Sequence, residues 1–477
     1  MVSSRVIDEK ELRLHASESS CWMSIEGTVY DITDFLSKHP GGKAILLRFA
    51  GCDATTEFKK YHPSSLLELL PASSVVGRFL GAAKMTDETK RTIVPNVPLG
   101  HILNVYDFAT NARARVTKES WDYLVSAADD EVTYRENESS FNRVWIRPRV
   151  LTNVAGIIDT SVSLLGTKCS SPIFISATAM GRLYHPDGEV ELCRGASRSG
   201  IIQMCPTLAS CSMTEMASAR SPNQTQWYQL YVNTDMKLNE KVVKQAEALG
   251  YKALVITVDV AVLGKRERDQ RNKVTDISNI QKSTGQEVDK SQGVSRALSS
   301  FVCPALDWEM VRWFKSITKM PILLKGIQTK EDAIKAAASG LVRGIIVSNH
   351  GGRQVDFSRP TVDCLVEIVD ALKTQKGVKL NENFDVYVDG GIRRGTDIFK
   401  CLALGAKAVG IGRPAMFALA SHGQEGVHHL IDILTQELIV CLMHTGCRSL
   451  KDINRTHVEL SNWKSVRYDP AHHESRL

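Results

Sequence analysis

The sequence predicts a small α+β domain at the N-terminus, followed by a larger α/β barrel of the (β/α)8 or TIM type. Three observations carry this prediction. The chain of 477 residues is too long for one average domain. Its first 80 residues have the pattern of short strands and helices, and from residue 172 eight apolar runs alternate with helical segments.

The eight apolar runs have the composition of parallel strands that are buried on both faces. Each run is five to seven residues long, and helical segments such as 330–339 lie between them. No G-x-G-x-x-G follows an early strand, so the pattern favours a barrel over an open dinucleotide-binding sheet. The runs are 172–177, 200–204, 226–231, 252–258, 321–325, 343–348, 385–389 and 406–411.

Turn and linker signals follow the first domain. The segment 77–81 is rich in turn residues, a polar stretch occupies 82–91, and Pro95 and Pro98 come next. We therefore expect a first domain at 1–80, a linker at 81–99, a barrel at 100–465 and a C-terminal tail at 466–477. The stretch 270–300 interrupts the repeat after the fourth strand, and we interpret it as a mobile lid over the barrel.

Composition and charge exclude several classes of protein. Hydrophobic residues make up 43% and charged residues 23%, which is ordinary for a globular chain. The net charge is only +6, without a run of like charges, so we expect no nucleic-acid partner. No stretch approaches 18 consecutive apolar residues, so we expect no membrane span.

Cysteine usage and the chain ends bear on the compartment. The eleven cysteines form no C-x-x-C pair, which favours reduced thiols over a zinc site or a disulfide framework. The N-terminus lacks an apolar signal core, and its early acidic residues argue against a transit peptide. The chain ends in Ser475-Arg476-Leu477, close to the peroxisomal Ser-Lys-Leu signal. We expect the peroxisome or the cytoplasm.

Two histidines in the first domain suggest a haem site. His39 begins a His-Pro-Gly-Gly motif, and His62 follows 23 residues later in Tyr-His-Pro. Two neutral imidazoles can occupy both axial positions of a haem iron, which leaves no open site for oxygen and favours electron transfer. Apolar residues at 45–49 and Phe58 would line the pocket. The alternative is a turn that ends a helix, with two unrelated surface histidines.

Ionisable and amide side chains follow six adjacent barrel strands. Singly they have ordinary explanations, such as a helix cap or a solvated lysine, but their gathering at the carboxyl ends of the strands indicates an active site. In chain order they are Gln229 and Tyr231, Thr257 and Asp259, Lys325, then Ser348, Asn349, His350 and Arg353, then Asp389 and Arg393, and lastly Arg413.

These residues suit the oxidation of a 2-hydroxy acid by a flavin. The glycine amides and arginines after strands 7 and 8 fit one phosphate monoester, which suggests FMN. Lys325 could offset negative charge on a reduced flavin. Arg353 can hold a substrate carboxylate, His350 can act as the base, and Asp259 could orient the imidazole and raise its pKa.

Both parts resemble known families. With Trp22, Tyr30 and Phe35 upstream of the two histidines, residues 5–80 resemble the cytochrome b5 domain. The motifs 348–354, 257–259, 229–231 and 389–397 resemble the FMN-dependent 2-hydroxy-acid oxidase and dehydrogenase family over residues 100–465. The combination is similar to the flavocytochrome b2 family, the cytochrome-linked L-lactate dehydrogenases.

The resemblance implies a role for each motif residue. His39 and His62 would be the axial ligands of haem b. His350 would be the base, Asp259 its partner, and Tyr231 a hydrogen-bond partner of the reacting hydroxyl. Arg353, Tyr123 and Arg266 would contact the substrate carboxylate or the developing product. The implied FMN-binding residues are Ala177, Thr178, Ala179, Gln229, Thr257, Lys325, Ser348, Asp389, Gly390, Gly391, Arg393, Gly412 and Arg413.

The resemblance also implies partners. Electrons would pass from FMN through haem b to cytochrome c or a similar acceptor, and the chain would form a homotetramer. The mitochondrial intermembrane space is a further compartment implied by the family, although no presequence is visible. The rival interpretations are an oxidase that reduces O2 to H2O2, a non-catalytic haem protein, and another phosphate-binding barrel.

Three departures from the family pattern concern substrate choice and flavin affinity. Pro206 stands where a serine is usual, Ala127 where a glycine is usual, and Ala261 where a proline is usual.

Overall fold

The computed structural model describes residues 5–39, 43–79, 96–272 and 302–461. The chain divides into two compact units, one formed by 1–95 with 210–212 and 269–301, the other by the remaining residues. The second unit thus begins at Asn96, four residues before the barrel boundary expected from the sequence. The expected lid and C-terminal tail lie outside the described residues, apart from the first three residues of the lid.

The N-terminal unit is built on a five-stranded sheet of order β1-β5-β4-β3-β2. Asp8 starts the first helix by accepting a hydrogen bond from the Glu11 N–H at 2.8 Å. The strands are β1 (Val6–Ile7), β2 (Ala16–Ser17), β3 (Ser20–Ile25), β4 (Thr28–Asp31) and β5 (Val75–Phe79). The helices are α1 (Glu9–Leu14), α2 (Lys43–Arg48) and α3 (Thr55–Tyr61).

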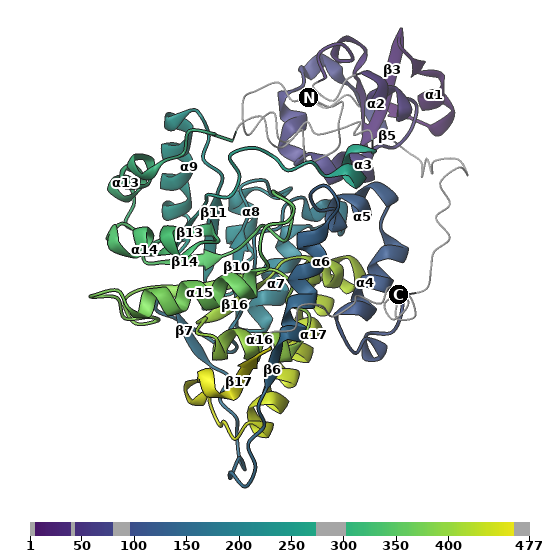
Figure 1. Cartoon of the computed structure of the whole chain (residues 1–477). Coiled ribbons are helices and arrows are strands. Elements are labelled where there is room, and N and C mark those ends of the chain that lie inside the picture. The colour runs from purple at the N-terminus through teal and green to yellow at the C-terminus, as the bar shows by residue number, and fades with distance from the viewer. Residues whose placement is uncertain (1–4, 40–42, 80–95, 273–301, 462–477) are drawn as a thin grey trace. The chain divides into compact units, whose positions relative to one another are not determined.

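The second unit contains a closed barrel of eight parallel strands, so the predicted fold class is confirmed (Figure 1). All eight expected runs form strands, with boundaries that differ by a few residues. They are β9 (Ile173–Ile175), β10 (Ile202–Cys205), β11 (Gln226–Leu230), β12 (Leu254–Thr257), β13 (Ile322–Ile327), β14 (Gly344–Val347), β15 (Asp385–Asp389) and β16 (Ala408–Ile411).

Helices follow the barrel strands and begin at side-chain caps where the sequence supplies them. Asp235, Asp307 and Thr329 each accept hydrogen bonds from the first turn of their helices. The helices are α7 (Glu189–Arg198), α8 (Met213–Ser218), α9 (Met236–Ala248), α10 (Glu267–Gln270), α13 (Trp308–Ile317), α14 (Lys330–Ala338), α15 (Thr361–Lys373), α16 (Gly395–Ala403) and α17 (Arg413–His444).

Helices and short strands outside the repeat precede the barrel or flank it. The helices are α4 (Val105–Arg115), α5 (Lys118–Val125) and α6 (Val132–Ser139). The strands form two antiparallel pairs, β6 (Val144–Ile146) with β17 (Val458–Leu460), and β7 (Val162–Leu164) with β8 (Thr167–Cys169). Segment 126–131 and helix α6 matter most for function, because they meet the loops after strands β14 and β15.

Aromatic side chains fill the interior of the barrel. Phe174, Trp227 and Tyr387 are fully buried, and their ring centroids lie 5.5 to 5.9 Å apart. This packed layer makes the barrel a solid core rather than a pore. Chemistry is therefore confined to the loops at the carboxyl ends of the strands.

Helix α17 is the one described helix long and apolar enough to pass a membrane-span test by length and composition. It packs against α4, α7 and α16, and its buried residues face that core. Its backbone also leaves helical geometry at His422 and Gly423, where two helices meet at a kink. These features are those of a core helix.

Candidate active site

The loop after β14 holds the central histidine in an unusual backbone conformation. His350, Gly351 and Gly352 have φ values of 57°, 64° and 77°, all in the left-handed region. A Cβ at position 352 would lie 2.7 Å from the Tyr134 backbone nitrogen, so glycine is required there. For histidine this conformation costs about 1 kcal/mol or more, and such strain is concentrated at functional sites.

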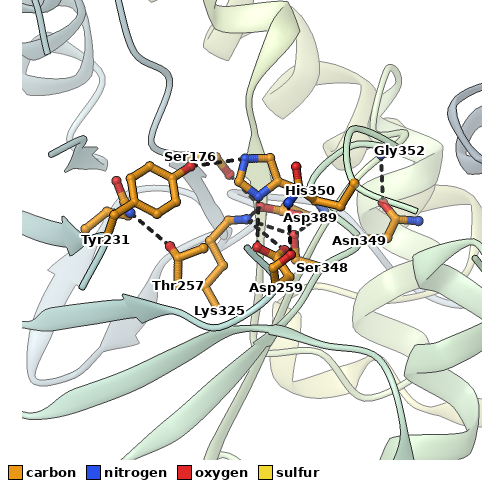
Figure 2. A network of polar contacts seen from close by, with 12 residues as sticks. Ser176, Tyr231, Thr257, Asp259, Lys325, Ser348, Asn349, His350, Gly352 and Asp389 are labelled. Atoms are coloured by element: carbon orange, nitrogen blue, oxygen red, sulfur yellow. Dashed lines mark hydrogen bonds and ion pairs between the residues drawn. The ribbon is translucent and has the colours of Figure 1, made fainter. Parts of the chain in front are cut away.

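His350 lies between a carboxylate and a phenol (Figure 2). Its Nδ1 is 2.9 Å from Asp259 Oδ1, and its Nε2 is 3.2 Å from the Tyr231 hydroxyl. Because a carboxylate only accepts, Nδ1 carries the proton and Nε2 is left with a lone pair. Burial raises the pKa of Tyr231, which therefore stays a protonated donor. The arrangement presents Nε2 as a proton acceptor.

The pKa of His350 is lowered overall from its ordinary value of 6.5, although Asp259 raises it as the sequence suggested. Burial is the largest cause, and the positive charges of Lys325 and Arg266 add to it. Asp259 pulls the pKa upward, but burial together with the two cations outweighs it. The neutral imidazole that a base requires is thus favoured near neutral pH.

Lys325 lies buried between two carboxylates. Its Nζ is 3.9 Å from Asp259 Oδ2 and 3.8 Å from Asp389 Oδ2, and it donates to Ser348 Oγ at 2.9 Å. Among the described residues, Asp259 Oδ2 and Asp389 Oδ1 are buried without a hydrogen-bond partner. Buried orphan oxygens beside a buried cation indicate that polar groups of a ligand complete this site.

Thr207 joins the strand-end residues on the other side of the site. It accepts from the Tyr231 N–H at 3.0 Å through Oγ1 and donates from its own N–H to Gln229 Oε1 at 3.1 Å. Gln229 Nε2 in turn donates to Thr257 Oγ1 at 2.9 Å. Thr207 follows Pro206, the family departure, and was not among the residues predicted for the site. Thr207 positions two predicted residues, Tyr231 through its hydroxyl and Gln229 through both its hydroxyl and its backbone N–H.

Three arginines converge near the ends of β14, β15 and β16. Burial lowers the pKa of Arg413 to about 10, and the nearby positive charges of Arg353 and Arg393 contribute to that shift. Arg413 donates to the carbonyls of Leu124, Ser126 and Gly351, and its guanidinium lies 4.5 Å from the Tyr134 ring centroid. Mutually repelling buried cations fit a site for an anion such as a phosphate.

The other arginines predicted for the site contact neighbouring protein groups. Arg393 pairs with Glu138 at 2.7 Å, an anionic partner that the sequence did not reveal. The Arg353 guanidinium lies 5.2 Å from the Tyr123 ring centroid and donates to the Tyr123 carbonyl. Arg266 is buried and donates to the Arg353 carbonyl at 3.1 Å. Arg353, Tyr123 and Arg266 therefore lie in one cluster beside His350.

Small residues leave room at the strand ends. Ala177, Thr178 and Ala179 follow β9 and are partly exposed. A Cβ at Gly412 would find only Thr178 Cγ2 within 4 Å, at 3.5 Å. Gly391 instead packs tightly, because a Cβ there would lie 1.9 Å from the Asn137 carbonyl oxygen. The site thus combines open space at Gly412, buried cations and two carboxylate oxygens without hydrogen-bond partners. A ligand with a flat ring system and a phosphate group suits this combination.

The two histidines of the N-terminal unit face each other. Both are buried, and their ring centroids are 6.2 Å apart. That separation suits one iron between them, with two metal–nitrogen bonds of about 2 Å plus the distance from each nitrogen to its ring centre. Ile45, Phe49 and Phe58 belong to the adjoining apolar cluster, as expected. The glycines 41 and 42 lie outside the described residues.

Comparison with known proteins assigns the chain to a family. The FMN-dependent dehydrogenase family model matches residues 112–460, most of the chain. The chain belongs to the FMN-dependent dehydrogenase family. The model of the cytochrome b5-like haem/steroid-binding domain matches residues 8–80. FMN is therefore the cofactor of the barrel, and haem that of the N-terminal domain.

Relatives of this family member fall into two groups. An L-lactate dehydrogenase (cytochrome) of Wickerhamomyces anomalus is 44% identical, covering 92% of this chain and 77% of the relative. The Saccharomyces cerevisiae enzyme of the same name is 39% identical, covering 96% and 80%. A peroxisomal (S)-2-hydroxy-acid oxidase of Arabidopsis thaliana is 41% identical, but covers 76% of this chain and 98% of its own length.

Solved structures include both kinds of relative. A mutant flavocytochrome b2 with pyruvate bound has a TM-score of 0.70 at 40% identity, covering 79% of this chain and 92% of that one. A mandelate oxidase mutant has a TM-score of 0.66 at 34% identity, covering 76% and 100%. The two structures cover similar shares of this chain, whereas the two cytochrome-linked dehydrogenases cover 92% and 96% of it by sequence.

Proposed function

We propose that this chain oxidises an L-2-hydroxy acid, foremost L-lactate to pyruvate, and passes the electrons through haem b to cytochrome c or a similar acceptor. The observation that carries the proposal is the presence of two sites in one chain. A neutral histidine oriented by a carboxylate lies at the barrel mouth, and a facing histidine pair lies in the b5-like domain. Bound FMN supplies the two-electron acceptor, and haem supplies the one-electron path to the external acceptor.

His350 is the proposed base. Its Nε2 takes the proton that the hydroxy acid loses. In the substrate complex, the substrate hydroxyl replaces Nε2 as the hydrogen-bond partner of the Tyr231 phenol. Asp259 holds the Nδ1–H, and its charge stabilises the imidazolium that forms. Burial opposes ionisation of Asp259, but His350 and then Lys325, 3.9 Å from its second oxygen, lower the pKa of Asp259 below its ordinary value. The carboxylate therefore stays ionised.

The arginines are the proposed anion sites. Arg353 and Arg266 lie beside His350 and bind the substrate carboxylate together with Tyr123. Arg393 and Arg413 would hold the FMN phosphate, with a contribution from the loop amides after β15. Gln229, Thr257 and Lys325 lie at neighbouring strand ends and would contact the flavin ring.

The alternative function is an oxidase that reduces O2 to H2O2, as the barrel-only relatives are named. The pair of His39 and His62 argues against it, because these two histidines would hold a haem iron, and a haem held by two histidines would supply electron transfer rather than O2 reduction. The test mixes the purified holoenzyme with L-lactate and compares peroxide formation with cytochrome c reduction. Cytochrome c reduction is expected to dominate, and rapid stoichiometric peroxide formation would reject the dehydrogenase assignment.

Substrate size is the finer part of the proposal. Leu208 and Ala179, which the family resemblance places at the substrate side chain, leave room for a methyl group. We expect the highest kcat/KM with L-lactate, measured against glycolate, mandelate and a long-chain 2-hydroxy acid. Preference for mandelate or the long-chain acid would move the assignment to another substrate within the class.

The chain is proposed to act as a homotetramer. Between β6 and β7, the large apolar side chains of Val150, Leu151 and Ile157 are exposed, and Trp145 is also more than half exposed. A second copy of the chain would bury this apolar surface. Leu151→Arg is expected to yield smaller species by light scattering, whereas Val440→Arg, at an exposed valine on α17, keeps the assembly. A monomeric wild-type protein would contradict the proposal.

The compartment follows from the acceptor. The sequence favoured the peroxisome or the cytoplasm, yet two relatives with a peroxisomal name match only about three quarters of this chain. Two cytochrome-linked relatives match over both domains, which supports the mitochondrial intermembrane space instead. Imaging of the native-host protein beside peroxisomal and mitochondrial markers tests this. Colocalisation with the peroxisomal marker would restore the original expectation.

A further inference from the structure

Gln354, the residue after Arg353, makes three side-chain hydrogen bonds between two loops of the site. Its Oε1 accepts from Arg266 Nη2 at 2.9 Å. Its Nε2 donates to the carbonyls of Asp259 at 3.1 Å and Val262 at 3.0 Å. Arginine can only donate and carbonyls can only accept, so the orientation of the amide is fixed.

The two loops lie so close together at Gly264 that no side chain would fit there. A Cβ at Gly264 would lie 2.3 Å from the Gln354 carbonyl oxygen and 2.4 Å from that of Arg353. Arg266 Nε also donates to the Arg353 carbonyl at 3.1 Å. The loop after β12, which carries Asp259 and Arg266, is thereby joined to the loop after β14, which carries His350 and Arg353.

We propose that Gln354 is a positioning residue of the reaction, which holds the Arg266 guanidinium and the Asp259 backbone in a fixed relation to His350. The proposal rests on the function proposed above. Gln354 reaches the chemistry only through Arg266 and Asp259, and it is not itself a substrate contact. Its amide supplies an acceptor and two donations at once, which neither a carboxylate nor an apolar side chain can do.

The arrangement has an electrostatic consequence at His350. The charged or polar groups that face the imidazole are Asp259, Lys325, Arg266 and Tyr231. Asp259 raises the pKa of His350, while burial, Lys325 and Arg266 lower it. If Arg266 turns away when its Gln354 partner is lost, one lowering influence weakens. The pKa of His350 then rises, and the base is protonated over a wider range of pH.

The test compares two variants of the holoenzyme. Gln354→Met keeps the length of the side chain and removes all three hydrogen bonds. Gln354→Glu keeps an acceptor for Arg266 but removes both donations to the loop carbonyls. Ser358→Ala, on the same loop, is the matched control, since its hydroxyl bonds the Val355 carbonyl and not Arg266.

Gln354→Met is expected to lower kcat/KM about ten- to hundredfold, the usual effect of losing a hydrogen bond to a charged group. The acidic limb of its kcat/KM profile moves to higher pH, and binding of oxalate, followed by flavin absorbance, weakens. Gln354→Glu shows a smaller loss because Arg266 keeps a partner. FMN content stays at the wild-type level in both variants.

Two outcomes would overturn the proposal. One is an unchanged kcat/KM, oxalate affinity and pH profile in Gln354→Met. The other is a loss of activity that only follows a loss of FMN or of folded protein, with the acidic limb in place. Failure of the proposed function is distinct from both, because the wild-type flavin would then not be reduced by any 2-hydroxy acid tested.

Discussion

At the scale of residues, His350 combines backbone strain with a fixed side chain. Its left-handed backbone is supported by the Ser348 hydroxyl, which accepts from the His350 N–H at 3.1 Å. The imidazole is fixed by Asp259 on one side and Tyr231 on the other. Surrounding contacts thus compensate for an unfavourable local conformation, and they leave one nitrogen lone pair facing the site.

Asp259→Asn tests the role of the carboxylate. Neutral His350 is the active form, so activity rises as pH rises through its pKa. Asp259 raises that pKa, and removing its charge is expected to move the acidic limb of kcat/KM to lower pH. Loss of orientation lowers kcat by about 100- to 10,000-fold. Asp370→Asn, at an exposed carboxylate on α15, is the control for a simple change of charge. An acidic limb that moves to higher pH would contradict this assignment.

At the scale of elements, the glycine pair after β15 decides how closely α6 approaches the barrel. Gly390 and Gly391 both have positive φ, and Gly391 lies directly against the Asn137 carbonyl of α6. Asn137 and Asn349 exchange hydrogen bonds at 2.8 and 2.9 Å, which ties the same helix to the β14 loop. The proposed phosphate site is therefore shaped by a helix outside the eightfold repeat.

Gly391→Ala is expected to destabilise the protein and to loosen FMN. Its Cβ would overlap the Asn137 carbonyl, with a cost of about 1–3 kcal/mol for overpacking in addition to backbone strain. Gly377→Ala is the matched control, because φ is +84° there and its Cβ meets nothing within 4 Å. Thermal unfolding and the FMN-to-protein ratio measure the difference. Equal effects of the two substitutions would show that packing against α6 is unimportant.

At the scale of the whole molecule, two cofactor sites with separate residue sets serve one electron path. The proposed haem ligands, His39 and His62, belong to the N-terminal unit, and the proposed base and flavin contacts belong to the barrel unit. Because the sets are separate, each site can be disabled while the other remains intact.

His39→Ala or His62→Ala is expected to abolish haem absorbance and reduce the rate of cytochrome c reduction to background, since one axial ligand is lost. Anaerobic reduction of the flavin by L-lactate keeps its wild-type rate within about twofold, because the barrel residues are untouched. His15→Gln, a histidine of the same domain that stacks on Trp22, is the control and retains haem. Retention of normal haem absorbance in His39→Ala would exclude that residue as a ligand.

The sequence by itself determined the fold class and predicted most of the residues that the structure brings together at the carboxyl ends of the strands. Runs of apolar residues and the groups that follow them are local features, and the eight runs formed the eight strands with small shifts in boundary. The resemblance of the motifs predicted the two families and their cofactors, and the family comparisons confirmed both. These predictions succeed because each depends on residues close together in the chain.

Only the tertiary structure decided the electrostatics and the supporting contacts. Whether burial or Asp259 controls the pKa of His350 depends on groups about 90 residues apart, and here burial dominates. Thr207, Glu138 and Gln354 carry no motif signal of their own; they matter because the barrel brings distant loops within hydrogen-bonding distance. Distances across the barrel mouth therefore decide how the predicted residues act together.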